Sequence, residues 1–242
     1  NIGQGAGATS TSGQDYDGAI SEYSPQYFLK LDEGTGTSLT NSGSSSDIAS
    51  LSSVVNPAWV TGFDPDGYSL SFTVASGRAL SRIHTTLSDG STGLPTNRTQ
   101  NWSLMMLTKL NAIVTSKNIW EWANGGQGMS TFNINSDGKM YLWWYDTTGH
   151  EVIADTDVVD DEWHTLGQTH ASDGSIAWYL DGVPDGTGTE GETYSLDNDS
   201  DTLNLFDNGG GGLGSMIFDC FFFKQSVMTD EEMAGLSAKL GK

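Results

Sequence analysis

Residues 163–183 read Trp-His-Thr-Leu-Gly-Gln-Thr-His-Ala-Ser-Asp-Gly-Ser-Ile-Ala-Trp-Tyr-Leu-Asp-Gly-Val, and this stretch decides the fold. It predicts a strand over 163–169, a turn at 172–174 and a returning strand over 175–180. The turn follows from Asp and Gly, which accept the backbone angles of a tight reversal. An isolated hairpin is barely stable in water, so this one must belong to a larger sheet.

The returning strand also indicates what lies beside that sheet. Ile176, Trp178 and Leu180 share one face by the two-residue period of a strand, while Ala177 and Tyr179 share the other. The face that carries the tryptophan is strongly apolar. We therefore expect a second sheet to cover it, as in a β-sandwich.

Three stretches, in this order along the chain, resemble one family. Residues 25–37, Pro-Gln-Tyr-Phe-Leu-Lys-Leu-Asp-Glu-Gly-Thr-Gly-Thr, resemble the opening strand and the Asp-Glu-x-x-Gly-Thr turn of laminin-G-like domains in the concanavalin A-like superfamily. Residues 163–183 resemble the core hairpin of these domains, and residues 218–236 their closing strand and terminal helix. The resemblance implies an all-β fold over residues 23–242, a two-sheet antiparallel jelly-roll β-sandwich with one short C-terminal helix.

The predicted helix runs from Asp230 to about Leu240. Thr229 suits the N-cap position, and a Glu three residues later completes a Thr-x-x-Glu capping box. Met228 and Met233 occupy the positions of a hydrophobic staple. These local signals make this the one helix that the sequence predicts.

Charge and hydropathy exclude two classes of partner. The 242 residues include 31 acidic and 10 basic ones, for a net charge of −21. A chain this acidic repels nucleic acid and anionic membrane surfaces. No apolar run approaches the ~20 residues of a membrane helix, so we expect no membrane insertion. The single cysteine, Cys220, cannot form an internal disulfide and gives no indication of the compartment.

Residues 1–22 are rich in Gly, Ser, Thr and Ala, which predicts a flexible or partner-bound N-terminal arm. Such a segment has too few apolar groups to offset its ordering entropy alone. We expect the arm to attach the domain to other protein chains, in a homo-oligomer or on a viral shell. The alternative is that the arm adds an edge strand to its own sandwich.

Catalysis is not expected. The related glucanases carry a Glu-x-Asp-x-(x)-Glu pattern, which places acid and nucleophile on one face of a strand, and this chain lacks it. Glu121 stands between Trp120 and Trp122 with no carboxylate two residues away. His164 and His170 are six residues apart on one predicted strand, too far for one zinc ion at ~3.3 Å per residue. A degenerate glucanase is the least favoured alternative.

Calcium is the one candidate cofactor. Asp197-Asn-Asp-Ser-Asp201 places oxygen ligands at alternate positions, as hard cations prefer. The run is not an EF-hand, because Thr and Asn occupy its sixth and twelfth positions. Calcium at the sandwich rim is a recurrent feature of the family, so Asp207 and Asp181 are further candidates. We name Asp197, Asp199, Asp201 and Asp207 as the metal ligands. The alternative is that these residues only form turns.

An aromatic run suggests the ligand site. Trp143, Trp144 and Tyr145 could stack on a sugar ring, with Asn124 and His150 on neighbouring polar segments. Loops over a rigid sandwich commonly carry binding function. The alternative is that the aromatic alternation belongs to the core.

The sequence therefore favours a non-catalytic binding or structural module that acts outside a cell. We expect a bacteriophage virion surface protein, such as a capsid decoration, an appendage or a tail component, that contacts host glycans. The alternative is a secreted or cell-surface bacterial lectin-like module that binds carbohydrate. Fold alone does not decide between them.

Overall fold

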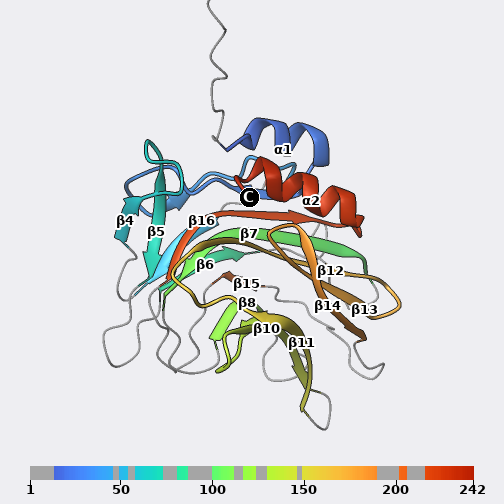
Figure 1. The fold of residues 1–242 in the computed structure, drawn as a ribbon. Coiled ribbons are helices and arrows are strands. Elements are labelled where there is room, and N and C mark those ends of the chain that lie inside the picture. The colour runs from blue at the N-terminus through green and yellow to red at the C-terminus, as the bar shows by residue number, and fades with distance from the viewer. Residues whose placement is uncertain are drawn as a thin grey trace, which may run out of the picture.

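The computed structural model describes residues 14–45, 49–53, 58–72, 81–86, 100–111, 117–123, 130–145, 149–189, 202–205 and 216–242. Two antiparallel sheets face each other, and two helices cover the outer face of one of them (Figure 1). The prediction of an all-β, two-sheet antiparallel sandwich with one short C-terminal helix is confirmed.

The first sheet lies under the helices. Its eight described strands are, in spatial order, β14 (Val183–Thr189), β13 (Ser175–Leu180), β12 (Trp163–His170), β7 (Trp102–Leu110), β16 (Met216–Lys224), β5 (Tyr68–Phe72) and β4 (Ala58–Thr61), with β1 (Tyr27–Leu29) also pairing with β16.

The second sheet faces away from the helices. Its eight described strands are, in spatial order, β11 (Gly149–Asp157), β10 (Lys139–Tyr145), β9 (Ser130–Ile134), β8 (Lys117–Ala123), β15 (Thr202–Leu205), β6 (Ser81–Thr86), β3 (Ala49–Ser53) and β2 (Ser38–Leu39).

The predicted hairpin is the pair β12–β13. Its register places Leu166 opposite Leu180 and His170 opposite Ile176. The next turn, from β13 to β14, has positive φ at both central residues, 50° at Asp181 and 77° at Gly182. Two positive φ angles characterise the tight hairpin turns whose twist matches that of the flanking strands.

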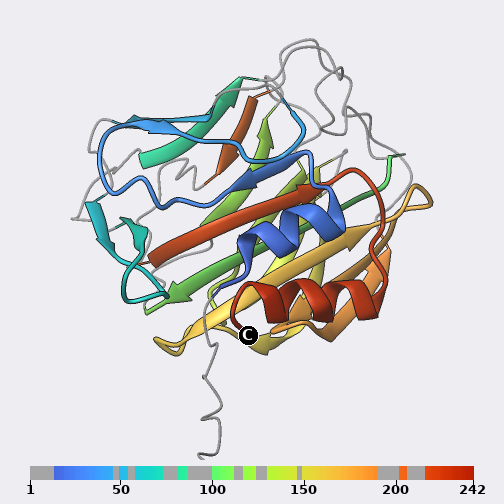
Figure 2. The same ribbon diagram turned by 90° about the horizontal axis from the view of Figure 1, so that it is seen from above.

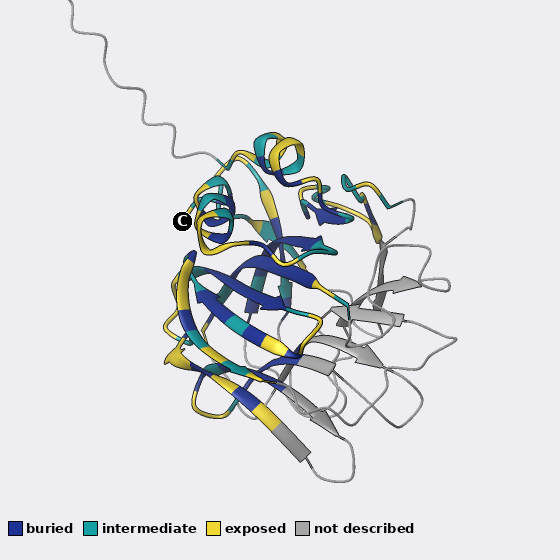
Figure 3. Cartoon of the chain, turned by 90° about the vertical axis from the view of Figure 1, so that its right-hand side faces the viewer, coloured by how far each residue is buried: buried dark blue, intermediate teal, exposed yellow. Residues whose placement is uncertain are grey.

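The inner face of this hairpin packs against the second sheet, as expected. Trp178 is fully buried, and its ring meets that of Phe132 from β9 edge to face, with ring centroids 5.0 Å apart. Leu166 and Ile176 belong to the same core. In Figure 3 buried residues run along the central strands.

The outer face of the first sheet is equally apolar and lies beneath α1 (Tyr16–Tyr23) and α2 (Asp230–Lys239), as Figure 2 shows. Met105, Phe222 and Tyr179 are buried there with residues of both helices. The sheet is therefore apolar on both sides, and each side has its own covering layer.

The predicted capping box of α2 is present. The Thr229 hydroxyl accepts a hydrogen bond from the Glu232 backbone N–H at 3.2 Å, and the Glu232 carboxylate accepts one from the Thr229 N–H at 2.8 Å. Met228 and Met233 are both buried. The sequence predicts this helix correctly because its capping signals act over only a few residues.

The structure differs from the predicted arm over residues 14–22. Helix α1 begins after the N-cap Asp15, and Ala19 and Tyr23 on one of its faces are buried against the first sheet. These residues thus belong to the domain, and residues 1–13 lie outside the described part. The polar average over residues 1–22 concealed a few apolar residues at helical spacing.

A buried carboxylate fixes α1 in place. Asp219 of β16 is 2 % exposed and accepts hydrogen bonds from the Gln14 side chain, the Tyr16 hydroxyl at 2.5 Å, the Ser69 hydroxyl and the Phe63 N–H at 3.0 Å. Four donors offset the cost of burying a charge.

Asp219 is also the residue at which β16 changes register. Phe218 lies opposite Thr108 and Cys220 opposite Leu107, so one residue of β16 is unmatched. A β-bulge of this kind re-aims side chains. As a result Phe218 and Phe221 both reach the core between the sheets, although their numbers differ in parity.

We expect Trp178→Ala to lower the free energy of unfolding by about 3–5 kcal/mol, because it empties a fully buried site. Trp163 is only half-buried, with its ring edge to face with Phe63 at 5.7 Å, so Trp163→Ala should cost clearly less. Urea denaturation of the two variants measures the difference. Equal losses of unfolding free energy in the two variants would contradict the assignment of Trp178 to the core and Trp163 to its margin.

Candidate functional site

The residues predicted to bind a sugar lie where β10 ends and β11 begins. In the backbone register Trp143 is opposite Glu151, Trp144 opposite His150, and Tyr145 opposite Gly149. The structure thus brings the backbone of this aromatic run beside that of His150. The side chains of Trp143, Trp144, Tyr145 and His150, and all of Asn124, lie outside the described residues.

The first part of strand β10 is core. Met140 and Leu142 are fully buried between the sheets, and Tyr141 is 9 % exposed. One face of this part of β10 therefore belongs to the core, through Met140 and Leu142, whereas Tyr141 is not part of that core cluster. The alternative that the aromatic residues 143–145 belong to the core stays a prediction.

The predicted metal ligands Asp197, Asp199, Asp201 and Asp207 lie outside the described residues. The chain re-enters the second sheet at Thr202, which is in register with Ala123. Within the described ranges no group of three or more His, Cys, Asp or Glu side chains could hold a metal ion.

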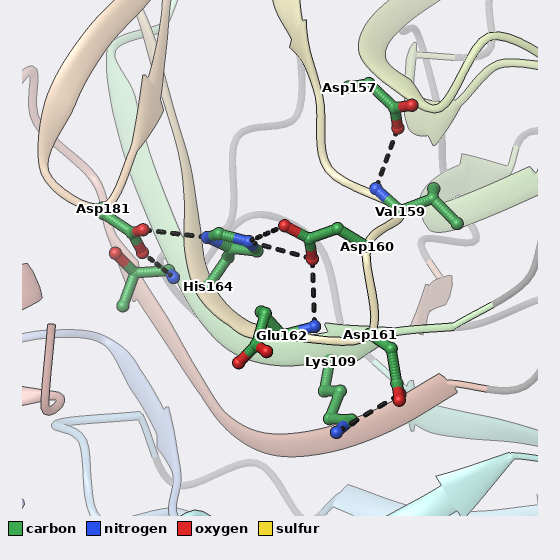
Figure 4. A network of polar contacts seen from close by, with 9 residues as sticks. Lys109, Asp157, Val159, Asp160, Asp161, Glu162, His164 and Asp181 are labelled. Atoms are coloured by element: carbon green, nitrogen blue, oxygen red, sulfur yellow. Dashed lines mark hydrogen bonds and ion pairs between the residues drawn. The ribbon is translucent and has the colours of Figure 1, made fainter.

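The opposite end of the sandwich carries a polar network centred on His164 (Figure 4). His164 Nδ1 lies 2.8 Å from Asp181 Oδ2, and Nε2 lies 3.2 Å from both oxygens of Asp160. Asp181 also accepts the Thr165 N–H at 2.9 Å, and Asp160 accepts the Glu162 N–H at 2.9 Å. The histidine joins the β11–β12 connection to the β13–β14 turn.

The charged groups of this network favour one another's ionised forms. The hydrogen bond that His164 donates to Asp181 raises the pKa of His164 above its ordinary 6.5, against the effect of burial, and Asp160 adds to the rise. Burial acts to raise the pKa of Asp181, but the bonds from His164 and the Thr165 N–H outweigh it and lower that pKa. The network thereby favours the protonated form of His164 beside two carboxylates.

This arrangement is a structural cross-brace. Both ring nitrogens of His164 face carboxylates, so neither is left to activate a nucleophile. Asp181, a calcium candidate in the sequence, is instead the partner of His164 and Thr165. The sequence did not indicate this pairing, because the sheet register that aligns β12 with β13 brings the two residues together.

Strand β11 presents an acidic edge. Glu151, Asp155 and Asp157 are exposed, whereas Val152 and Ala154 between them are buried. β11 is the edge strand of the second sheet. Charges on an edge strand oppose pairing with another chain's strand.

Comparison with solved structures finds similar folds among toxin binding domains. The binding domain of Botulinum neurotoxin DC, solved with rat synaptotagmin II, superposes with a TM-score of 0.69 at 11% identity, covering 90% of this chain and 52% of that chain. The binding domain of Paraclostridial Mosquitocidal Protein 1 gives a TM-score of 0.69 at 10% identity with the same coverage.

A third similar structure comes from botulinum neurotoxin type C, whose cell entry is dependent upon interaction with two ganglioside molecules. It has a TM-score of 0.67 at 13% identity. It covers 90% of this chain and 51% of that chain. This chain spans about half the length of these proteins. At such identities the likeness establishes the β-sandwich fold.

No family model and no curated protein matches the sequence. Among the described residues, neither helix has the length and apolar character to cross a membrane.

The His164 network predicts a pH dependence. The raised pKa of His164 means that its contribution to stability is complete below about pH 6.5 and is lost as the pH rises through that raised value. The lowered pKa of Asp181 means that its contribution is present above about pH 3.8 and is lost on acidification through its lowered pKa.

We therefore expect the wild-type Tm to fall as the pH rises from about 6.5 through the raised pKa of His164, and His164→Asn to flatten that fall. The control is Glu151→Gln, which removes an exposed carboxylate from β11. Thermal melts across this range provide the measurement. Parallel profiles for wild type and His164→Asn would show that the brace contributes nothing.

Proposed function

We propose that this chain is a non-catalytic, laminin-G-like binding module of the concanavalin A-like superfamily that acts outside a cell and recognises surface glycans. The observation that carries the proposal is the fold likeness over 90% of the chain to binding domains. One of these proteins depends on interaction with two ganglioside molecules for cell entry, and another such binding domain was solved in complex with SialylT. The order along the chain of the three stretches that resemble laminin-G-like domains supports membership of the same superfamily.

The glycan site of this proposal is the β10–β11 end with Trp143, Trp144, Tyr145, Asn124 and His150. Support comes from the register that aligns Trp144 with His150. Aromatic rings are suited to stacking on the apolar faces of sugars. Calcium bound by Asp197, Asp199, Asp201 and Asp207 is part of the proposal, and oxygen ligands of this kind suit it.

The proposal does not include catalysis. The glucanase carboxylate pattern is missing from the sequence, and the buried side of His164 is committed to Asp181. Site residues rather than fold decide activity.

Display on a bacteriophage virion is the finer part of the proposal, in preference to secretion as a free lectin. The helices lie on the opposite side of the sandwich from β10 and β11 (Figure 1). A chain attached through residues preceding α1 would thus direct the β10–β11 end outward. Attachment would be to a viral shell or within a homo-oligomer.

A glycan array with the purified chain, in excess calcium and in chelator, tests the binding function. We expect glycan binding that Trp143→Ala or Trp144→Ala weakens at least about tenfold, as loss of a stacked anchor typically does. Trp59→Ala is the control, since Trp59 lies half-buried in β4 of the first sheet.

Each outcome of these experiments tests one part of the proposed function. An array without signal contradicts the glycan function, and unchanged binding in both tryptophan variants contradicts the site. Equal glycan binding in calcium and in chelator contradicts the calcium site. Release of reducing sugar from a β-glucan contradicts the non-catalytic assignment.

Deleting residues 1–13 tests the attachment. Gln14 and the whole of α1, including Tyr16, remain, so the bonds to Asp219 persist and the domain should keep its Tm. We expect the shortened chain to lose particle association or self-assembly, measured by co-sedimentation and light scattering. Normal assembly of the shortened chain would refute the attachment role.

A further inference from the structure

A small pocket opens on the helix side of the first sheet, away from the β10–β11 end. Its volume is about 210 Å³, and its lining combines two aromatic rings, a glycine, an amide and four carboxylates, namely Tyr16, Tyr68, Gly67, Gln14, Asp32, Asp64, Asp66 and Asp219. Pockets for drug-sized ligands measure roughly 300–1,000 Å³. This one suits a group the size of a single side chain.

Tyr68 forms an aromatic wall that is open to solvent. It is 49 % exposed, one of four large apolar side chains in the described part with such exposure. Its ring rests on Gly34, where an added Cβ would lie 2.7 Å from the ring carbons. Gly34 also has a φ of +68°, which other residues rarely adopt. The glycine thus lets the ring approach the backbone and holds its position.

Three of the donors around the pocket are already engaged. The Gln14 amide and the Tyr16 hydroxyl both donate to Asp219, and the Asp66 N–H donates to Asp64 at 3.0 Å. Asp219 already accepts four hydrogen bonds, so what remains for a ligand are oxygens of Asp32, Asp64 and Asp66 and the ring and hydroxyl of Tyr68. None of the lining residues is basic. The pocket therefore presents acceptors and negative charge in front of an aromatic face.

Charge and geometry select the ligand. An anion is repelled, and a neutral sugar would leave the charge of the carboxylates uncompensated. A divalent metal ion is not matched either, because no three acidic side chains of the described residues converge tightly enough to hold one. An alkylammonium group supplies three donors and a positive charge, and it can lie over the Tyr68 ring as a cation–π contact.

We propose that this pocket binds a primary alkylammonium group. The group can come from a lysine side chain of a protein partner or from an amino sugar, and both present the same chemistry. The site is separate from the β10–β11 glycan site and does not depend on it.

Titration calorimetry and ligand-observed NMR on the whole chain test this inference. The two ammonium probes are Nα-acetyl-lysine methylamide and glucosamine, and their neutral counterparts are the Nε-acetylated lysine derivative and N-acetylglucosamine. We expect saturable binding of an ammonium probe, weakened by added salt, and none of the neutral compounds. The tighter ammonium probe identifies the source, a protein lysine or an amino sugar.

Variants locate the binding. Tyr68→Ala should weaken the ammonium probe about fivefold and Tyr68→Phe should leave it nearly unchanged, because the ring provides the cation–π contact. Asp66→Asn should weaken it about threefold. Asp155→Asn, which removes an exposed carboxylate from β11, is the matched control and should have no effect.

Several outcomes would overturn the proposal: equal binding of neutral and charged probes, equal weakening by Asp155→Asn and Asp66→Asn, or no effect of Tyr68→Ala in a variant whose circular dichroism is unchanged. Trp143→Ala and Trp144→Ala should bind the ammonium probes normally. The ammonium site can therefore be refuted while the glycan function is supported, and the reverse.

Discussion

Strands β7 and β16 bury side chains on both of their faces, and the remaining architecture follows from this constraint. Leu104 and Met106 of β7 face the second sheet, while Met105 and Leu107 face the helices, and all four are fully buried. A strand with two apolar faces needs a cover on each side. The sandwich is therefore three layers deep here, and α1 and α2 are structural necessities of the first sheet.

Among the residues that the structure describes, the helix-side layer contains one buried carboxylate, that of Asp219, and it organises the surrounding surface. Asp219 stands at the bulge of β16 and draws in Gln14 and Tyr16 from the N-terminal segment, Phe63 from the β4–β5 turn and Ser69 from β5. A buried carboxylate is tolerated only with such donors. Because the donors come from separate segments, satisfying the charge also shapes the pocket beside Tyr68.

The two ends of the sandwich have different characters. At one end His164 holds two connections together through Asp160 and Asp181, which gives a rigid, charged rim. At the other end β10 and β11 bring an aromatic run beside His150 in the backbone register. Rigid elements beneath variable connections are the usual setting for binding in such sandwiches. The acidic edge of β11 keeps this surface from pairing with other chains.

Local patterns carried much of the fold. The two-residue alternation of residues 175–180, the turns at Asp and Gly, and the capping box at Thr229 each act over a few residues, so the amino-acid order alone predicts the hairpin and α2. The aromatic run at 143–145 was likewise visible as a candidate site. Its partner positions in β11 and the docking of α1 arise from contacts between distant segments. The Asp181–His164 pair and the pocket at Tyr68 also arise from contacts between distant segments. Only the sheet register and the bulge at Asp219 bring these residues together.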